Sequence, residues 1–339
     1  MALLTPVAPE TSRVNTVVLG YNPYRYRQEA ALVREELTRS GYRVVPVPTD
    51  QDVSSTASSL AEVIKIIPVE KPEEIGIGVV GGDGTTAHVI KASRLKAVTN
   101  LTGGKSPISP LAGGFAGDHR RSCHGDLGRT PSEIMRYGVI IPAHWIIREL
   151  LPPGSSEPTV EEAYMYAGVG KTAEGARRTN IVDSEEGKIH RSLRLGLGTL
   201  FTQIEFDADI GNRKQRLSDI SVATIGRMSM VGFTNTEPWA NDMRVVITAA
   251  GRVSNIISVA QLMLPVFPVG FSSKSFSFTV LGDVLAHLDG DPPDVLQAGT
   301  RVQYTSSAET YRTLTTRIAP RLTHGVQQTA QLLRGIRNH

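Results

Sequence analysis

The chain has 339 residues, of which 40% are hydrophobic and 20% are charged. At roughly 150 residues per domain, this length predicts two domains, and the composition supports a packed core. A disulfide-stapled miniprotein and a wholly disordered chain are therefore excluded. The formal net charge is +3, which is too small to indicate a nucleic-acid-binding protein, so we expect no nucleic-acid partner.

Cysteine usage and hydropathy both favour a cytoplasmic protein. Cys123 is the single cysteine, so no disulfide can form within the chain. Residues 1–13 lack the charged segment and apolar run of a signal peptide. The most apolar stretch, residues 256–271, is interrupted by polar residues and prolines and is too short to span a bilayer. We expect a cytoplasmic protein that is able to bind peripherally to the inner face of the membrane.

Strand and helix signals alternate in the first half of the chain. The apolar patterns predict strands at residues 17–19, 42–47, 75–80 and 108–111, and helices at residues 28–40, 55–67 and 86–98. A capping box from Thr130 to Glu133, with Pro131 at the first helical position, predicts one more helix. Strands separated by helices of this length indicate βαβ units and a mostly parallel sheet.

Strand signals dominate after a Pro-Gly-Ser stretch at residues 151–156, which we interpret as a linker. Strands are predicted at residues 164–169, 244–248, 276–280, 284–288 and 302–305, with one helix at residues 189–206. This pattern indicates a largely antiparallel domain. The predicted organisation is an α/β nucleotide-binding domain at residues 14–150, a β-rich domain at 151–306 and a basic helical segment at 307–336.

Several familiar signatures occur at positions that do not suit them. Residues 76–81 spell the dinucleotide-binding fingerprint, but its first two glycines lie inside the predicted strand. Residues 104–106 and 170–172 resemble the end of a P-loop, but the first glycine of that motif is absent in both. His119, Cys123 and His124 have no partner cluster, so a polar loop is favoured over zinc and any metal ligands stay unknown.

The most specific motif is the loop between the predicted strand at 75–80 and the next helix, formed by Gly81, Gly82, Asp83, Gly84 and Thr85. Glycines let the backbone approach a phosphate closely, and the N–H groups at the start of a helix face an anion. The threonine adds a hydroxyl group. The same residues also suit a tight turn with an aspartate cap, so the residues alone leave both interpretations open.

The loop resembles the nucleotide-binding motif shared by diacylglycerol kinase catalytic domains, sphingosine kinases and NAD kinases. Other segments resemble the lipid-kinase branch in the same order along residues 14–320. Leu19 to Pro23 is similar to a strand that ends in Asn22-Pro23, residues 109–118 are similar to a glycine-rich segment containing Gly113, and His287 to Pro292 is similar to an Asp-Gly-Glu motif.

This resemblance implies an N-terminal three-layer α/β nucleotide-binding domain and a C-terminal β-sandwich-like domain, with the last helix packing back on the first domain. It implies ATP and Mg²⁺ as cofactors. It places nucleotide contacts at Asn22, at Gly81 to Thr85 and at Gly113, and it makes Asp289 the catalytic base. The implied reaction transfers the ATP γ-phosphate to a lipid hydroxyl such as that of diacylglycerol.

The chain departs from the family pattern at several positions. Residues 24–26 are Tyr-Arg-Tyr where the family has serine and glycine, the Gly-Thr-Gly-Asn run is lost at 112–117, and His88 and Asp291 replace glutamates. Two alternatives therefore stay open: an NAD kinase-like enzyme, and a catalytically degenerate protein that binds nucleotide or lipid.

Two further sequence features have structural as well as functional interpretations. By sequence alone, Asp289-Gly290 is a strong signal for a hairpin turn between residues 284–288 and 301–305. The basic C-terminal segment suits a solvated face, and it also suits contact with anionic lipid headgroups. A homodimer remains open.

Overall fold

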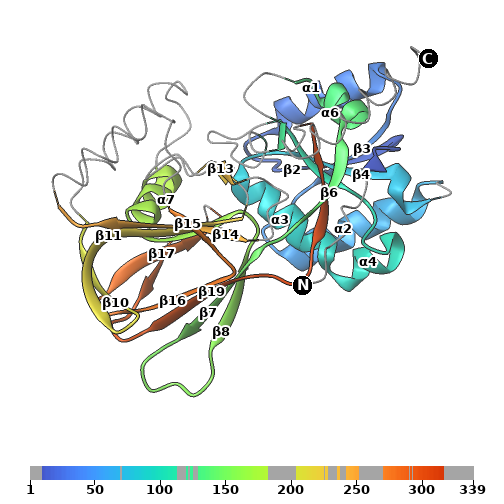
Figure 1. Cartoon of the computed structure of the whole chain (residues 1–339). Helices are drawn as coiled ribbons and strands as arrows, with labels where there is room; N and C mark the ends of the chain where they lie inside the picture. The colour runs from blue at the N-terminus through green and yellow to red at the C-terminus, as the bar shows by residue number, and fades with distance from the viewer. Residues whose placement is uncertain are drawn as a thin grey trace, which may run out of the picture.

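Two large β-sheets organise the chain, as the computed structural model shows (Figure 1). The structure describes residues 10–68, 71–112, 120, 123–124, 129–181, 204–224, 226–227, 235–236, 242–251, 270–289, 291 and 293–316. Within them, a seven-stranded sheet has the order β1-β6-β20-β5-β4-β2-β3, and an 11-stranded antiparallel sheet forms the second unit. A separate short pair joins β12 (Gly226–Arg227) and β13 (Asn235–Thr236).

The first sheet has a parallel centre covered by helices on both faces. Its parallel strands are β2 (Thr16–Tyr21), β3 (Arg43–Pro48), β4 (Ile75–Val80) and β5 (Ile108–Ala112), while β1 (Glu10–Thr11), β6 (Val139–Ala143) and β20 (Tyr311–Thr315) complete it. The helices are α1 (Arg27–Arg39), α2 (Val53–Ile66), α3 (Asp83–Arg94), α4 (Lys96–Thr102) and α6 (Pro131–Tyr137), with a 3₁₀ turn at Pro72–Glu74.

Successive side chains of each strand point to opposite faces of the sheet, and this alternation produces the three layers of the domain. Val17 and Leu19 pack with residues of α1 and α6 on one face. Val18, between them, packs with residues of α2, α3 and α4 on the other face. Because successive strand side chains point to opposite faces, a fully apolar strand needs cover on both sides, and the two helical layers supply it.

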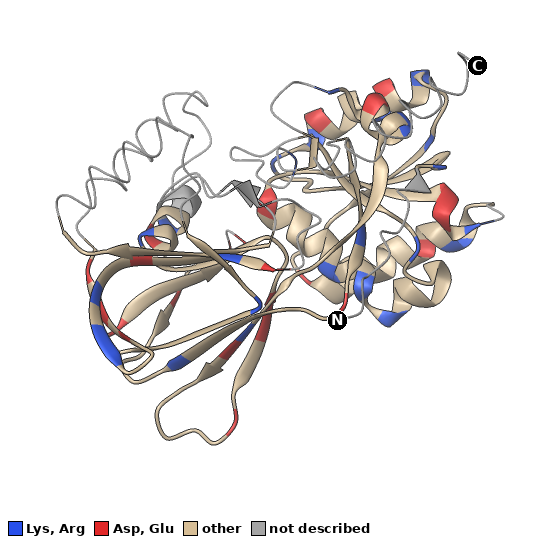
Figure 2. Cartoon of the chain, viewed as in Figure 1, with Lys and Arg blue, Asp and Glu red and all other residues tan. Residues whose placement is uncertain are grey.

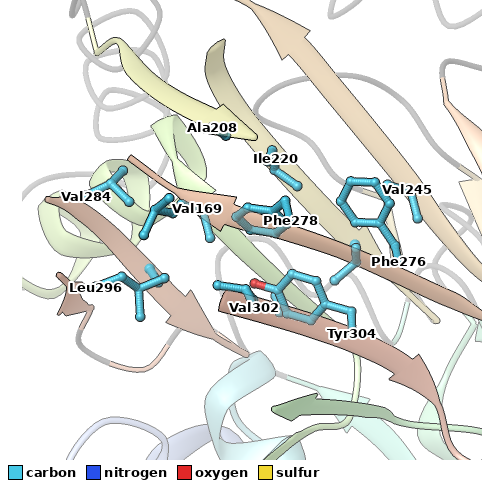
Figure 3. Packing of buried hydrophobic residues seen from close by; sticks show 14 of the residues in the cluster. Val169, Ala208, Ile220, Val245, Phe276, Phe278, Val284, Leu296, Val302 and Tyr304 are labelled. Atoms are coloured by element: carbon cyan, nitrogen blue, oxygen red, sulfur yellow. The ribbon is translucent and has the colours of Figure 1, made fainter. Parts of the chain in front are cut away.

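The second sheet folds around its own core. It contains β7 (Ile146–Leu151), β8 (Thr159–Ala163), β9 (Tyr166–Gly170), β10 (Phe206–Ile210), β11 (Arg213–Ala223), β14 (Met243–Ala249), β15 (Phe271–Ser273), β16 (Ser275–Val280), β17 (Val284–Leu288), β18 (Asp294–Leu296) and β19 (Arg301–Ser306). Figure 3 shows side chains from β9, β11, β16, β18 and β19 meeting in one interior, with Phe276, Phe278 and Tyr304 as the largest. Helix α7 (Lys171–Ile181) packs against β9 and β17.

The structure confirms the predicted α/β plus antiparallel β architecture. It also confirms the predicted strand at residues 75–80, which encloses Gly76 and Gly78 in β4. A β-carbon on Gly78 would lie 2.6 Å from Leu111 Cδ1. These glycines therefore permit close packing inside the sheet, and they do not form a dinucleotide loop.

The predicted linker at residues 151–156 is in fact the turn between the paired strands β7 and β8. The chain passes from the first sheet to the second at His144 and Trp145, and it returns after Ser306. Leu150 and Leu151 already belong to the second sheet, because they pair with β19. Proline and glycine mark a hairpin turn as readily as a linker, which explains the error.

The helical segment predicted at residues 307–336 is wrong at its start, because Tyr311–Thr315 form β20 in the first sheet. Thr313 pairs with both β5 and β6, and its side chain is fully buried. Tyrosine and threonine favour such a pleated, buried setting, and the neighbouring strands decide the conformation. Residues 317–336 lie outside the described residues, as does most of the helix predicted at 189–206. Helix α7 was not predicted.

Charge is mixed over both domains. In the view of Figure 2, lysines and arginines are interspersed with aspartates and glutamates on both sheets and on the helices. Among the helices that the structure describes, none has the length and apolar character needed to cross a membrane.

Candidate functional site

A cleft of about 170 Å³ lies where three parallel strands of the first sheet end. Strands β2, β3 and β4 run parallel, so their carboxyl ends share one edge of the sheet. The residues lining the cleft come from the segments after these strands: Asn22, Tyr24, Thr49, Asp50, Gln51, Gly84, Thr85 and His88. Open α/β sheets bind ligands at this edge.

The Gly81–Thr85 loop turns directly from β4 into α3. The N–H of Gly81 donates to the carbonyl of Ala112 at 2.9 Å, which ties the loop to β5. A β-carbon on Gly81 would lie 2.5 Å from Thr85 Cβ, so this position tolerates no side chain while Thr85 keeps its place. The N–H groups of the first helical turn have no acceptor within the helix, and they carry the positive end of its dipole.

The predicted loop residues have different roles in this geometry. Gly82 precedes α3 in an extended conformation, with φ of −76° and ψ of −177°. Asp83 is the first residue of α3 and is 8% exposed. Gly84 and Thr85 line the cleft. Gly113, the remaining predicted nucleotide contact from the glycine-rich segment, lies outside the described residues.

Asn22 lines the cleft and also shapes the turn after β2. Its Oδ1 accepts hydrogen bonds from the backbone N–H groups of Tyr24 at 3.0 Å and Arg25 at 3.3 Å. Asparagine commonly forms this type of turn. Asn22 therefore lines the same cleft as Gly84 and Thr85, and its side-chain carbonyl also holds the turn after β2.

Thr49, Asp50 and Gln51 line the cleft but were missed by the sequence reasoning. Their position could have identified them, because they follow β3 as Asn22 follows β2. His88 also lines the cleft, and its Nε2 lies 2.9 Å from Thr56 Oγ1. Burial lowers the pKa of His88 below its usual value, so the imidazole is neutral near pH 7.

Asp289 lies at the end of β17 in the second domain with its carboxylate turned inward. Its Oδ2 accepts a hydrogen bond from the N–H of Tyr164 at 2.5 Å. Its Oδ1 accepts from the N–H groups of Met165 at 2.8 Å and Tyr166 at 3.1 Å. The residue is 3% exposed and has a φ of 47°, a left-handed conformation that few non-glycine residues adopt.

Burial raises the pKa of Asp289 to about 7, although the three backbone donors oppose this shift. Through its three hydrogen bonds, the carboxylate holds the turn between β8 and β9 in place.

A hairpin turn at Asp289 was predicted correctly, but the predicted partner strand was wrong. Strand β17 pairs with β18 and β9, and not with residues 301–305.

The two predicted centres meet at the Gly81–Thr85 loop. A β-carbon on Gly84 would lie 3.6 Å from the carbonyl oxygen of Asp289. Asn22, Gly84 and Thr85 thus share the cleft, and Asp289 contacts the loop from the second domain without lining the cleft itself. The first domain therefore lines the cleft, and the second domain contacts its edge through Asp289.

Among the described residues, no group of three or more histidine, cysteine or acidic side chains could hold a metal ion. His124 is buried, with Nε2 3.1 Å from Ser109 Oγ and Nδ1 3.3 Å from Thr316 Oγ1. Cys123 is also buried, and His119 lies outside the described residues. The described part of this segment is a structural contact with β5 and with the end of β20.

Comparison with protein families and with curated proteins gives no match. The fold, however, is similar to that of known structures. A diacylglycerol kinase from Bacillus anthracis str. Sterne has a TM-score of 0.55 and 12% identity, with 94% of this chain and 100% of that chain covered. A provisionally assigned diacylglycerol kinase from the same organism has a TM-score of 0.55 and 12% identity, covering 88% of this chain and 97% of that one. At this identity the likeness establishes a shared fold, an α/β domain joined to a large antiparallel sheet.

Proposed function

We propose that this protein is a lipid kinase that binds ATP in the cleft and transfers its γ-phosphate to a lipid hydroxyl such as that of diacylglycerol. One observation carries the proposal. Gly84, Thr85 and His88 in the first turns of α3 form one side of the cleft, and Asp289 of the second domain approaches Gly84. Phosphoryl transfer depends on such positioning of a nucleotide between fixed donors.

The chemistry of the cleft suits polyphosphate bound through neutral donors. Backbone N–H groups at the start of α3 and side chains of Asn22, Thr49, Gln51 and Thr85 surround the space. None of the described residues lining the cleft is lysine or arginine. The helix dipole would therefore supply part of the positive field that the phosphates require.

Magnesium fits this donor set as an ion that arrives with the nucleotide. Mg²⁺ commonly takes one or two protein carboxylates and completes its shell with phosphate oxygens and water. Asp50 is the acidic side chain that lines the cleft, so it is the residue we assign to the ion. When bound, the ion neutralises charge on the phosphates.

Asp289 is the residue we assign as the base for the lipid hydroxyl. A carboxylate has roughly four acceptor positions, and the backbone donors occupy three. Its pKa of about 7 is close to the pH at which a general base works best. Because the carboxylate is buried, a hydroxyl reaches it only if the turn at Asp289 opens locally, while the domains keep their relative position.

The test combines binding with turnover. Isothermal titration of the protein with ATP and Mg²⁺ should show saturable binding that Gly84→Val weakens by at least about tenfold while thermal stability is kept. Labelled ATP should then transfer phosphate to a lipid hydroxyl in a panel of diacylglycerol, monoacylglycerol and sphingosine vesicles.

Two results would overturn the lipid kinase assignment. Formation of NADP from NAD and ATP, with no labelled lipid, would identify an NAD kinase-like enzyme. Saturable ATP binding without a labelled product in any arm would identify a binding protein that does not turn over.

A further inference from the structure

The two domains are joined by two crossings of the chain, at residues 144–145 and residues 307–310. The crossings are tied to each other. The N–H of Ser307 donates to the carbonyl of Trp145 at 2.8 Å, and His144 Nδ1 lies 2.7 Å from the carbonyl oxygen of Ser307. Any change in the orientation of the domains must therefore bend this pair of segments.

Arg94, the last residue of α3, contacts both crossings. Its guanidinium carbon lies 3.5 Å from the ring centroid of Trp145, which belongs to the first crossing. Its Nη2 lies 3.4 Å from Glu309 Oε2, which belongs to the second crossing. A planar guanidinium can stack on an aromatic ring and donate hydrogen bonds from its edge at the same time.

The same guanidinium also reaches the turn that Asp289 holds. Arg94 Nη1 donates to Glu162 Oε2 at 2.9 Å and to the hydroxyl of Tyr164. The Tyr164 hydroxyl in turn donates to Glu162 Oε2 at 2.5 Å. Burial, with the help of Glu162, raises the pKa of Tyr164 well above its usual value, so the hydroxyl keeps its proton for this bond.

Helix α3 therefore touches the second domain at both ends. At its start, Gly84 faces the carbonyl of Asp289. At its end, Arg94 binds Tyr164, whose N–H donates to the carboxylate of Asp289. The space between is filled by one apolar cluster that combines Ala87, Val89 and Ile90 of α3 with Trp145, Tyr164, Met165 and Tyr311.

We propose that Arg94 is a positioning residue that clamps the two domains and fixes the spacing between the Gly81–Thr85 loop and the Asp289 turn. Its role in turnover rests on the proposed kinase function. Trp145 is 2% exposed and the Arg94 side chain 23%, so the stacked pair lies within the junction between the domains. Loss of the clamp would leave ATP binding to the first domain and would misplace Asp289 relative to the loop.

The first arm of the test measures the distance between the two domains directly and does not require the protein to be active. Spin labels are placed at Leu32→Cys on α1 and Val160→Cys on β8, which are 66% and 59% exposed, in a Cys123→Ser background. The unaltered clamp should give one narrow distance distribution. Arg94→Lys, which keeps the charge but loses the planar fork, and Arg94→Met should each broaden it. Arg39→Met, which removes an exposed ion pair with Glu35 on α1, is the matched control.

The second arm separates binding from turnover. Arg94→Lys should lower kcat by at least about tenfold, because small misplacements of reacting groups are costly. Its ATP dissociation constant should stay within about threefold of the unaltered protein, because the cleft is remote from Arg94. If Arg94 only stabilised the fold, its variants would have a lower free energy of unfolding but an unchanged kcat and an unchanged ATP dissociation constant.

The outcomes of the two arms are distinct. An unchanged distance distribution in both Arg94 variants would overturn the clamp. A broader distribution with normal kcat would overturn the positioning role. If the unaltered protein phosphorylates nothing, the proposed kinase function fails, and the distance arm alone decides whether Arg94 fixes the domains.

Discussion

Gly84 and Asp289 meet across the two domains: a β-carbon on Gly84 would lie 3.6 Å from the carbonyl oxygen of Asp289. This separation is an ordinary van der Waals contact, so an alanine at position 84 fits the fold. Gly81 differs, because its β-carbon would lie 2.5 Å from Thr85 Cβ. The fold therefore requires a glycine at position 81 but not at position 84, and substitution can distinguish the two positions.

We expect Gly81→Ala to lower the free energy of unfolding and Gly84→Ala to maintain it. In the first variant the loop must shift, which costs of order 1–3 kcal/mol. In the second, alanine also favours the helix by up to about 1 kcal/mol. Urea unfolding measures both, with Gly282→Ala as the control, since no atom lies within 4 Å of its β-carbon position. Equal stability of Gly81→Ala and the control would contradict the steric account.

Stability should depend on pH through Asp289 and His287 with opposite signs. Asp289 has a pKa of about 7 in the fold against 3.8 unfolded, so the folded state holds the extra proton and this contribution falls as pH rises between these values. His287 is buried and its pKa falls to about 3 from 6.5, chiefly through burial. The unfolded chain then holds the extra proton, so this contribution rises with pH.

The measurement is urea unfolding of single variants at pH 4.5, 5.5 and 6.5. The stability of the unaltered protein relative to Asp289→Asn should decrease along this series, and its stability relative to His287→Gln should increase. For each group, the stability difference can change by at most about 1.4 kcal/mol per pH unit. If the two stability differences change with pH in the same direction, these protonation states are ruled out.

Binding to membranes, which we propose is peripheral, should be sensitive to salt. The net charge is +3 and both signs are interspersed over the described ribbons (Figure 2), so attraction to an anionic surface would be weak and screened. Sedimentation with anionic vesicles should decrease at least severalfold between about 0.05 M and 0.5 M salt. Retention at about 1 M salt would indicate apolar insertion.

Sequence patterns identified several elements of the first sheet and its helices because their signals are local. Apolar runs and glycines marked β4 and the loop after it, and the capping box of Thr130 and Glu133 forms as predicted at the start of α6. Each of these features is determined by residues a few positions apart, so the pattern contains the information. The cleft residues after β3 were missed because no special residue type marks them, although their position after a parallel strand was informative.

Long-range contacts account for what the sequence could not predict. The N–H groups that hold the Asp289 carboxylate come from residues 123 to 125 positions earlier in the chain. Nothing near Asp289 in the sequence indicates that the side chain is buried. Similarly, β20 lies between β5 and β6, although the predicted helical segment at residues 307–336 included it. Tertiary neighbours determine both features.

Asp289→Asn is the sharpest test of the proposed chemistry, because the carboxylate has two tasks. As a base it would contribute 10²–10⁴-fold, so turnover should fall by at least about 100-fold. As an anchor it accepts bonds on both oxygens, and an asparagine would turn its NH₂ group toward a backbone N–H. That unsatisfied pair should lower the free energy of unfolding by about 1–3 kcal/mol. ATP affinity should change little, because the cleft does not include this residue.

The pH–rate profile separates the base from the anchor. A base must be deprotonated, so with a pKa of about 7 the kcat of the unaltered protein should rise with pH and level off above about pH 7. Asp289→Asn should lose this acidic limb and retain a small rate that does not depend on pH there. Asp291→Asn, which alters the exposed carboxylate two residues away, should keep the limb and move it to lower pH, because the charge of Asp291 raises the pKa of Asp289. If Asp289→Asn lowers kcat but preserves the acidic limb, Asp289 acts only by holding the turn at Tyr164, and the proton must pass to another group.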